Sequence, residues 1–367
     1  MDEQAQLAAT VKHVFSDLEA LEARLEAEPE SFLRPTFRPG TEPALTGLGG
    51  PAPRDLAAAA PEDWGLTPWR EPEDLLGDAR SGLAKIRAAG DEPPDLTPGE
   101  EIGIRAIVLL EGRPSILIEN GRFASPPAEW AILEEYRVQI EANLASVGRI
   151  EVPGHPRMEW VGTGFLVAPT VIMTNRHVAV EFAEKKRGQG WMFLSGVQPR
   201  IDFCEEYGTE GAAEFECVEV VGVHPHLDMA LLRVEPRDAP GIELPSPLTL
   251  HYRTPRGLHD RKVYVVGYPA WDGRRNDPEA MRQIFAGIYD VKRLQPGTIR
   301  NRLVLGRTFE HDASTLGGNS GSCVVDLESG KVLGLHFAGL YREHNTAIAL
   351  WRLRRSTFLS RAGVNFG

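Results

Sequence analysis

The pattern of apolar and turn-forming residues changes after Val147, and this change is the strongest constraint on the fold. From there to the C-terminus, short runs of β-branched and apolar residues alternate with turn signals, and helical patterns are few. We expect strands at 160–167, 170–174, 217–224, 229–234, 262–267, 302–306, 323–327 and 332–337. Many short strands in about 220 residues predict a β-sandwich or a β-barrel.

The first 95 residues follow a different pattern. Residues 3–30 place apolar side chains near helical spacing and predict one amphipathic helix, which either packs on its own chain or docks a partner. Residues 31–70 are rich in Pro, Gly and Ala and predict a linker or an extended segment that wraps around the protein, and a short helix is expected at about 71–89. We interpret 1–95 as an acidic, mainly helical region.

Residues 96–146 combine both kinds of element. Thr97-Pro98-Gly99-Glu100 resembles a capping box and predicts a helix to about Leu110. A strand ending in an Asn-Gly turn is expected at 115–123, and a helix at about 126–146. The candidates for the buried face of that helix are Trp130, Leu133, Val138, Ile140 and Leu144. These residues predict a small α/β element that docks on a third unit, 147–367.

Charge is spread unevenly and limits the partners. Residues 1–150 carry 27 acids and 14 bases, whereas the remainder carries 25 acids and 26 bases. The acidic half disfavours nucleic acid and anionic membranes as partners, but it suits a regulatory protein partner. No apolar run approaches the ~20 residues that span a bilayer, and no signal peptide is evident, so a cytoplasmic location is expected.

The three cysteines agree with that location. Cys204 and Cys217 either pair or remain two reduced thiols, and Cys323 follows the serine motif in an apolar run. No Cys or His spacing suggests a metal, and no cofactor is expected.

The segment Gly317-Gly318-Asn319-Ser320-Gly321-Ser322 carries the most specific chemistry. Glycines beside a serine allow backbone conformations that aim successive N–H groups at one point. Within Gly318-Asn319-Ser320, the N–H groups of Gly318 and Ser320 would form an oxyanion hole, with Ser320 as the nucleophile. The alternative is an ordinary glycine-rich turn.

A serine nucleophile needs a base, and the base needs an acid to orient it. His177 sits just past two strands joined at Ala168-Pro169, and Asp228 immediately precedes an apolar strand. Each residue alone could be structural. In the order His177, Asp228, Ser320 they predict a catalytic triad.

The region from about Val147 onward resembles the trypsin-like (chymotrypsin-fold) serine peptidases through TNRHVA, LDMALLRV and GGNSGS. The resemblance implies a mostly β fold, with two six-stranded barrels and the active site at their junction. It also implies His177 as general base and acid, Asp228 as orienter and Ser320 as nucleophile. We therefore predict a serine endopeptidase that acts on proteins or peptides through an acyl-enzyme. The alternative is a catalytically silent docking module.

A narrower resemblance concerns specificity. TLGGNSG with Gly334-Leu335-His336-Phe337-Ala338-Gly339 is similar to the bacterial glutamyl-endopeptidase branch. The predicted substrate-pocket residues are Ser314, Thr315, His336, Phe337 and Ala338. The resemblance implies that Thr315 and His336 hold an acidic P1 side chain, the one preceding the cleaved bond; a neutral or apolar P1 is the alternative. Ser314 stands where trypsin-type enzymes carry an aspartate, which argues against a basic P1.

Activation is expected to differ from that of trypsin. Asn319 stands where trypsins carry the aspartate that pairs with a freed N-terminus. Arg149-Ile150 therefore resembles an activation site only superficially.

Overall fold

The computed structural model describes residues 3–15, 17–29, 32, 72–209, 211–237, 241–270, 288–301, 306–340 and 344–367. Apart from residue 32, the predicted linker lies outside the described residues, as does the predicted strand at 302–306 apart from its last residue.

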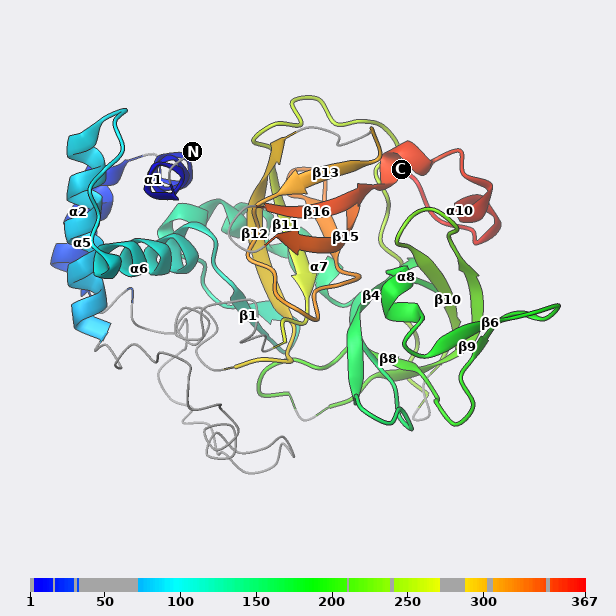
Figure 1. Ribbon diagram of the computed structural model, residues 1–367. Coiled ribbons are helices and arrows are strands. Elements are labelled where there is room, and N and C mark those ends of the chain that lie inside the picture. Colours follow the sequence, from blue (N-terminus) through cyan, green and yellow to red (C-terminus); the bar gives the residue numbers. More distant parts are fainter. Residues whose placement is uncertain are drawn as a thin grey trace.

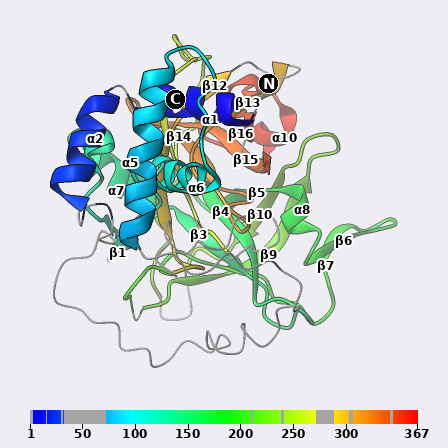
Figure 2. The same ribbon diagram turned by 60° about the vertical axis from the view of Figure 1, so that its left-hand side comes forward.

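Helices dominate the N-terminal region and form a body of their own beside the barrels (Figures 1 and 2). They are α1 (Glu3–Val14), α2 (Leu18–Ala27), α5 (Pro72–Ala89) and α6 (Pro98–Ile107), which continues into a π-helical turn, η1 (Val108–Gly112). All of them contribute to one apolar cluster. Because α6 belongs to this cluster, the helical core extends beyond residue 95. The predicted unit boundaries stay predictions.

The expectation of a single helix over 3–30 was wrong. Asp17 adopts an extended conformation and its carboxylate accepts a hydrogen bond from the N–H of Ala20, so it caps the start of a second helix. The capping box at α6 is present as predicted. Thr97 Oγ1 accepts from Glu100 N at 3.2 Å, and Glu100 Oε2 accepts from Thr97 N at 2.8 Å. No helix of the described residues is long and apolar enough to cross a membrane.

The segment after the helices forms a hairpin and then a bent helix. Strands β1 (Ile116–Glu119) and β2 (Arg122–Phe123) are joined by Asn120 and Gly121, both at positive φ. The next stretch begins as a 3-10 helix, η2 (Ala128–Tyr136), with a kink at Trp130, and continues as α7 (Arg137–Leu144). This change of helix type shifts the buried face. Val138, predicted to be buried, is 85% exposed.

Six antiparallel strands close the first barrel in the order β10-β5-β4-β3-β8-β9. They are β3 (Val147–Glu151), β4 (Trp160–Ala168), β5 (Val171–Thr174), β8 (Arg200–Asp202), β9 (Glu214–Val223) and β10 (Ala230–Val234). Between β5 and β8 lie the short helix α8 (Arg176–Ala179) and a projecting hairpin of β6 (Ala183–Lys186) and β7 (Gly190–Phe193).

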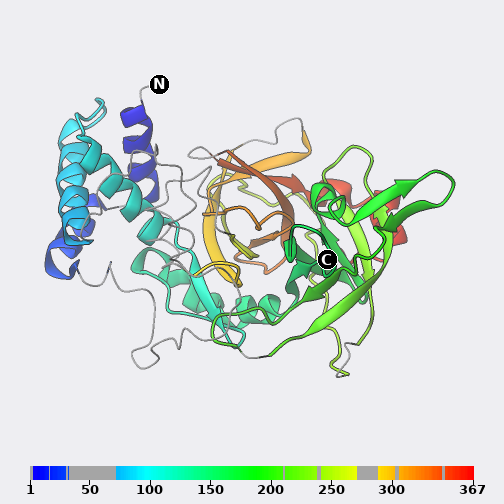
Figure 3. The ribbon, with the colours of Figure 1, turned by 60° about the horizontal axis from the view of Figure 1, so that its bottom comes forward.

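A second ring runs β11-β14-β15-β16-β13-β12, and β12 pairs back with β11 (Figure 3). Its strands are β11 (Lys262–Gly267), β12 (Arg293–Asn301), β13 (Thr308–His311), β14 (Cys323–Asp326), β15 (Val332–Leu340) and β16 (His344–Ala349). β1 extends this sheet at β12, and η4 (Leu350–Leu353) and α10 (Thr357–Arg361) follow β16. The fold is mostly β with two six-stranded barrels after a helical region, which confirms the predicted fold class.

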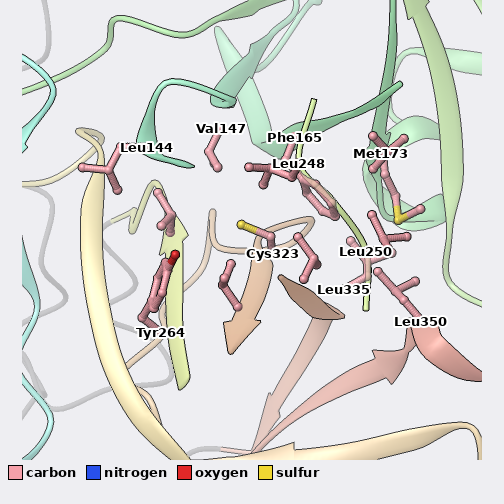
Figure 4. Packing of buried hydrophobic residues seen from close by; sticks show 14 of the residues in the cluster. Leu144, Val147, Phe165, Met173, Leu248, Leu250, Tyr264, Cys323, Leu335 and Leu350 are labelled. Atoms are coloured by element: carbon pink, nitrogen blue, oxygen red, sulfur yellow. The ribbon is translucent and has the colours of Figure 1, made fainter. Parts of the chain in front are cut away.

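One apolar cluster lies where the barrels meet (Figure 4). Phe165 and Met173 come from the first barrel, Cys323 and Leu335 from the second, and Leu144 from α7. We call this set the shared core. Because both barrels and α7 contribute to it, the shared core fixes the position of one barrel against the other.

Close backbone packing of α5 against α6 gives a stability test. A Cβ on Gly103 would lie 2.5 Å from Ala79 N, whereas one on Gly77 would meet nothing within 4 Å. Gly103→Ala should therefore destabilise the protein by ~1–3 kcal/mol. Gly77→Ala should be neutral or stabilising by up to ~1 kcal/mol, because alanine loses less entropy in a helix. Thermal unfolding followed by circular dichroism compares them; equal midpoints would contradict the packing.

Candidate active site

His177 and Asp228, on two segments of the first barrel, contact each other through two hydrogen bonds. Nδ1 of His177 lies 2.6 Å from Asp228 Oδ2, and the backbone N–H of His177 donates to Oδ1 at 2.9 Å. Asn175, which begins α8, donates from Nδ2 to the carbonyl of Asp228 at 3.0 Å. Three hydrogen bonds thus connect the segment that follows β5 with the turn that precedes β10.

The carboxylate of Asp228 is suited to orient the imidazole. Burial by itself raises the pKa of Asp228, but the hydrogen bonds from the ring and backbone of His177 outweigh it and lower the pKa. A carboxylate that stays ionised at neutral pH fixes the ring proton on Nδ1 and leaves Nε2 as a base. The His177 side chain is 49% exposed, so its ring is open to a substrate.

Gly162 lies between Ser320 and α8, and because it has no side chain the two can approach each other. A Cβ on Gly162 would lie 2.9 Å from the carbonyl oxygen of Ser320 and 3.0 Å from Val178 Cγ2 on α8. Thr163 N also donates to the Ser320 carbonyl at 2.9 Å. Among the described residues, no hydrogen bond joins the Ser320 hydroxyl to His177. Such bonds often tighten only when substrate is present.

The loop around Ser320 depends on two glycines. Gly318 (φ +83°) and Gly321 (φ +92°) occupy the left-handed region, and a Cβ would strike the Tyr268 carbonyl at the first and the Thr163 carbonyl at the second. Within the described residues, the N–H groups of Gly318 and Ser320 donate to no acceptor. The N–H of Asn319 instead donates to the carbonyl of Leu316 at 3.2 Å. Two of the three predicted oxyanion-hole residues therefore offer a free N–H.

The five predicted pocket residues differ in their burial and in their contacts. His336 is buried, and Thr315 Oγ1 donates to Asn345 Oδ1 at 2.8 Å. The hydroxyl of Ser314 is buried, with no partner among the described residues. Phe337 is partly buried and packs against the shared core. The side chain of Ala338 lies outside the description.

The sequence reasoning missed His311 and Asn345. Nε2 of His311 lies 3.2 Å from Nδ1 of His336, and His311 is fully buried. Burial lowers the pKa of His311 to about 3 and that of His336 well below its usual value, to which His311 and His177 add. The available signal was strand alternation, because His311 follows Phe309 by two residues and so shares its inward face.

One group of three carboxylates stands out among the described residues as a possible metal site. Oxygens of Glu151, Asp202 and Glu205 lie within 4.8 Å of one another. Arg149 Nη2, however, lies 2.7 Å from Glu151 Oε1 and 2.8 Å from Glu205 Oε1. The guanidinium of Arg149, together with that of Arg200, whose Nε lies 3.0 Å from Glu151 Oε2, thus already pairs with the cluster, which is better explained as an ion-pair network.

Comparison with known proteins identifies the family. A family model of the trypsin-like peptidase domain matches residues 162–335. A probable serine protease of Lysobacter enzymogenes is 30% identical over 367 residues, covering 88% of this chain and 91% of that protein. The chain belongs to the trypsin-like serine peptidases. This assignment confirms the prediction of a serine endopeptidase.

More distant relatives of this trypsin-like peptidase are also found. Glutamyl endopeptidase of Staphylococcus epidermidis is 24% identical over 189 residues, which cover 51% of this chain and 57% of that protein. Among solved structures, the serine endoprotease from Yersinia pestis is 18% identical with a TM-score of 0.42, covering 62% of this chain and 68% of that chain. A protease of M. tuberculosis in its active form is 21% identical with a TM-score of 0.40, covering 62% and 86%.

The resemblance of Arg149-Ile150 to an activation site of a trypsin-like peptidase is testable. Both residues lie inside β3, and the Arg149 side chain is only 14% exposed, whereas that of Lys186 on the projecting hairpin is 44% exposed. Limited digestion with trypsin should cut after the hairpin residues Lys185, Lys186 or Arg187 and leave the bond after Arg149 intact. Mass spectrometry of the fragments identifies the cuts. Early cleavage after Arg149 would contradict the placement of this bond within the barrel.

Proposed function

We propose that this peptidase cleaves peptide bonds through Ser320, His177 and Asp228. The observation that carries the proposal is the double hydrogen bond from His177 to Asp228, formed beside the loop that holds Ser320. Ser320 attacks the scissile carbonyl while Nε2 of His177 takes its proton. The imidazolium that forms is stabilised by Asp228 and returns the proton to the leaving amine. Water then releases the acyl-enzyme by the same steps.

The negative oxygen of the tetrahedral intermediate is held by the N–H groups of Gly318 and Ser320. Their lack of acceptors within the described residues supports this role, as does the backbone conformation that only glycine adopts easily at position 318. Such prearranged donors contribute about 2.7–4 kcal/mol each to transition-state stabilisation. Asn319 shapes the loop, since its N–H is engaged and its side chain is buried.

The specificity is non-tryptic. Ser314 offers a hydroxyl where a lysine or arginine at P1 would need a carboxylate. Thr315 and His336 favour a P1 side chain that forms hydrogen bonds. An acidic P1, the preference expected from the resemblance, has support from the similarity to a glutamyl endopeptidase.

The helical N-terminal region acts as a regulatory or partner-binding unit. Its apolar core, formed by α1, α2, α5, α6 and η1, supports a separate folded body. The net charge of residues 1–150, with 27 acids against 14 bases, favours a basic protein surface as its partner. The cytoplasmic location stays a prediction.

Replacement of the nucleophile tests the proposal. Ser320→Ala should reduce cleavage of a proteome-derived peptide library to the background rate, because the acyl-enzyme cannot form. Ser360→Ala, an exposed serine on α10, is the matched control and should leave cleavage unchanged. Peptide products are quantified by mass spectrometry. Cleavage that persists in Ser320→Ala would refute the assignment, and absence of cleavage by the wild type would favour the docking-module alternative.

A further inference from the structure

The turn between β9 and β10 carries Asp228, and the imidazole of His224 organises this turn. Nδ1 of His224 accepts a hydrogen bond from the backbone N–H of His226 at 3.2 Å and from that of Leu227 at 2.9 Å. The backbone N–H of His224 donates to the carbonyl of Met229 at 2.8 Å and closes the turn. One ring nitrogen thus holds the N–H groups of the two residues that directly precede Asp228.

These donors fix the protonation state of the ring. A backbone N–H can only donate, so Nδ1 of His224 must present its lone pair to both of them. The single proton of the neutral ring is therefore on Nε2. A second proton would go to Nδ1 and point at two N–H groups, so both hydrogen bonds would be lost. The turn in this form requires an uncharged His224.

Arg176 connects the same turn to α8. Its Nη1 donates to the carbonyl of His224 at 3.3 Å and to that of Pro225 at 3.1 Å. Asp228, further along the turn, accepts from both N and Nδ1 of His177, the residue after Arg176. The two hydrogen bonds to Asp228 form together only when the turn and α8 keep their relative position. A displacement of about 1 Å in a catalytic constellation can cost on the order of a hundredfold in rate.

The surroundings of His224 keep its ring uncharged. Burial lowers the pKa of His224, and so do the positive charges near it. Among the described residues, the ionisable groups that act on it are His226 in the same turn, Arg307 before β13 and Arg176 on α8. The ring also makes a T-shaped contact with Phe358 of α10, with ring centres 5.2 Å apart. At neutral pH the acceptor that the turn needs is therefore present.

From these contacts we propose that His224 is a positioning residue of the peptidase. Its unprotonated Nδ1 holds the turn in the form in which Asp228 meets His177. The inference rests on the proposed function, since it concerns the acid of the same triad. It adds a second histidine whose protonation lowers activity, besides the general base itself.

A second turn of the first barrel has the same construction and supplies a control. Nδ1 of His155 accepts from the backbone N–H of Arg157 at 3.3 Å and from that of Met158 at 3.1 Å. As with His224, the next residue is a proline. This turn lies between β3 and β4 and contains no residue of the triad. Substitution of His155 therefore shows what the loss of such a turn does by itself.

Two substitutions separate the ring nitrogen from the rest of the ring. His224→Ala removes the acceptor and should lower kcat by about tenfold or more, with KM changed by less than about threefold, because Asp228 no longer orients His177. His224→Asn should restore kcat to within about threefold of the wild type, because the amide oxygen accepts from the same two N–H groups. Asparagine cannot replace the packing of the imidazole on Phe358, so this rescue identifies Nδ1 as the group that acts.

The substrate is one peptide of the proteome-derived library that the wild type cleaves, and it is the same for all variants. His155→Ala should leave kcat within about twofold of the wild type. An equal loss of kcat in His155→Ala and His224→Ala would overturn the inference, because the effect would then not depend on Asp228. Thermal unfolding followed by circular dichroism verifies that each variant is folded at each pH.

The pH dependence gives a second readout. The pKa of His224 lies below the ordinary histidine value of 6.5, so its protonation breaks the turn only in acid. The ratio of kcat/KM for the wild type to that for His224→Asn should be constant above about pH 7 and fall about threefold or more toward pH 4.5, because asparagine does not titrate there. Protonation of His177 and ionisation of the peptide affect both proteins equally and cancel in the ratio.

The outcomes distinguish the two assignments. A loss of kcat in His224→Ala that His224→Asn restores, together with the fall in the ratio, supports the proposal. Wild-type kcat in His224→Ala, or an equal loss in both variants, overturns it. If His224→Ala does not fold, the ratio decides alone, since a constant ratio overturns the proposal and a falling one supports it. These results leave the peptidase assignment intact, whereas failure of the wild type to cleave any peptide overturns the proposed function and this inference with it.

Discussion

The shared core between the barrels is the constraint on which the site depends. Figure 4 shows Met173, Cys323 and Leu335 within this core. Met173 lies just before α8, which carries His177, Cys323 follows Ser320, and Leu335 precedes His336. Leu227 and Met229, on either side of Asp228, belong to the same core. Each polar group of the site is thus attached to a residue that is fixed by close packing. Full burial of a leucine or methionine side chain contributes roughly 2 kcal/mol to the free energy of folding. The packing of these apolar neighbours therefore holds the polar groups of the site in position.

Two histidines of this peptidase have opposite surroundings. His177 is half exposed and hydrogen-bonded to a carboxylate, whereas His336 is buried and contacts a second imidazole. The first environment supports a proton acceptor that becomes charged during the reaction. The second environment keeps the ring of His336 uncharged, because burial lowers its pKa well below the usual value.

Sequence reasoning recovered the parts of the molecule that local patterns encode. The strands near 160–167, 262–267 and 323–327, and the capping box at Thr97, depend on short-range periodicity and appear close to where they were predicted. The break between α1 and α2 was missed because Asp17 caps a second helix inside one amphipathic pattern. The exposure of Val138 was missed because the preceding 3-10 helix changes which face of α7 is buried. His311 and Asn345 were missed because their partners, His336 and Thr315, are 25 and 30 residues away in the sequence.

The proposed function depends on the activation of Ser320 by His177 and Asp228. Reaction with diisopropyl fluorophosphate, followed by peptide mapping with mass spectrometry, measures this activation. A single phosphorylated residue, Ser320, is expected, with a labelling rate that falls by at least about a hundredfold in His177→Ala, because the serine loses its general base. Labelling at another serine, or labelling of Ser320 at the same rate without His177, would contradict it.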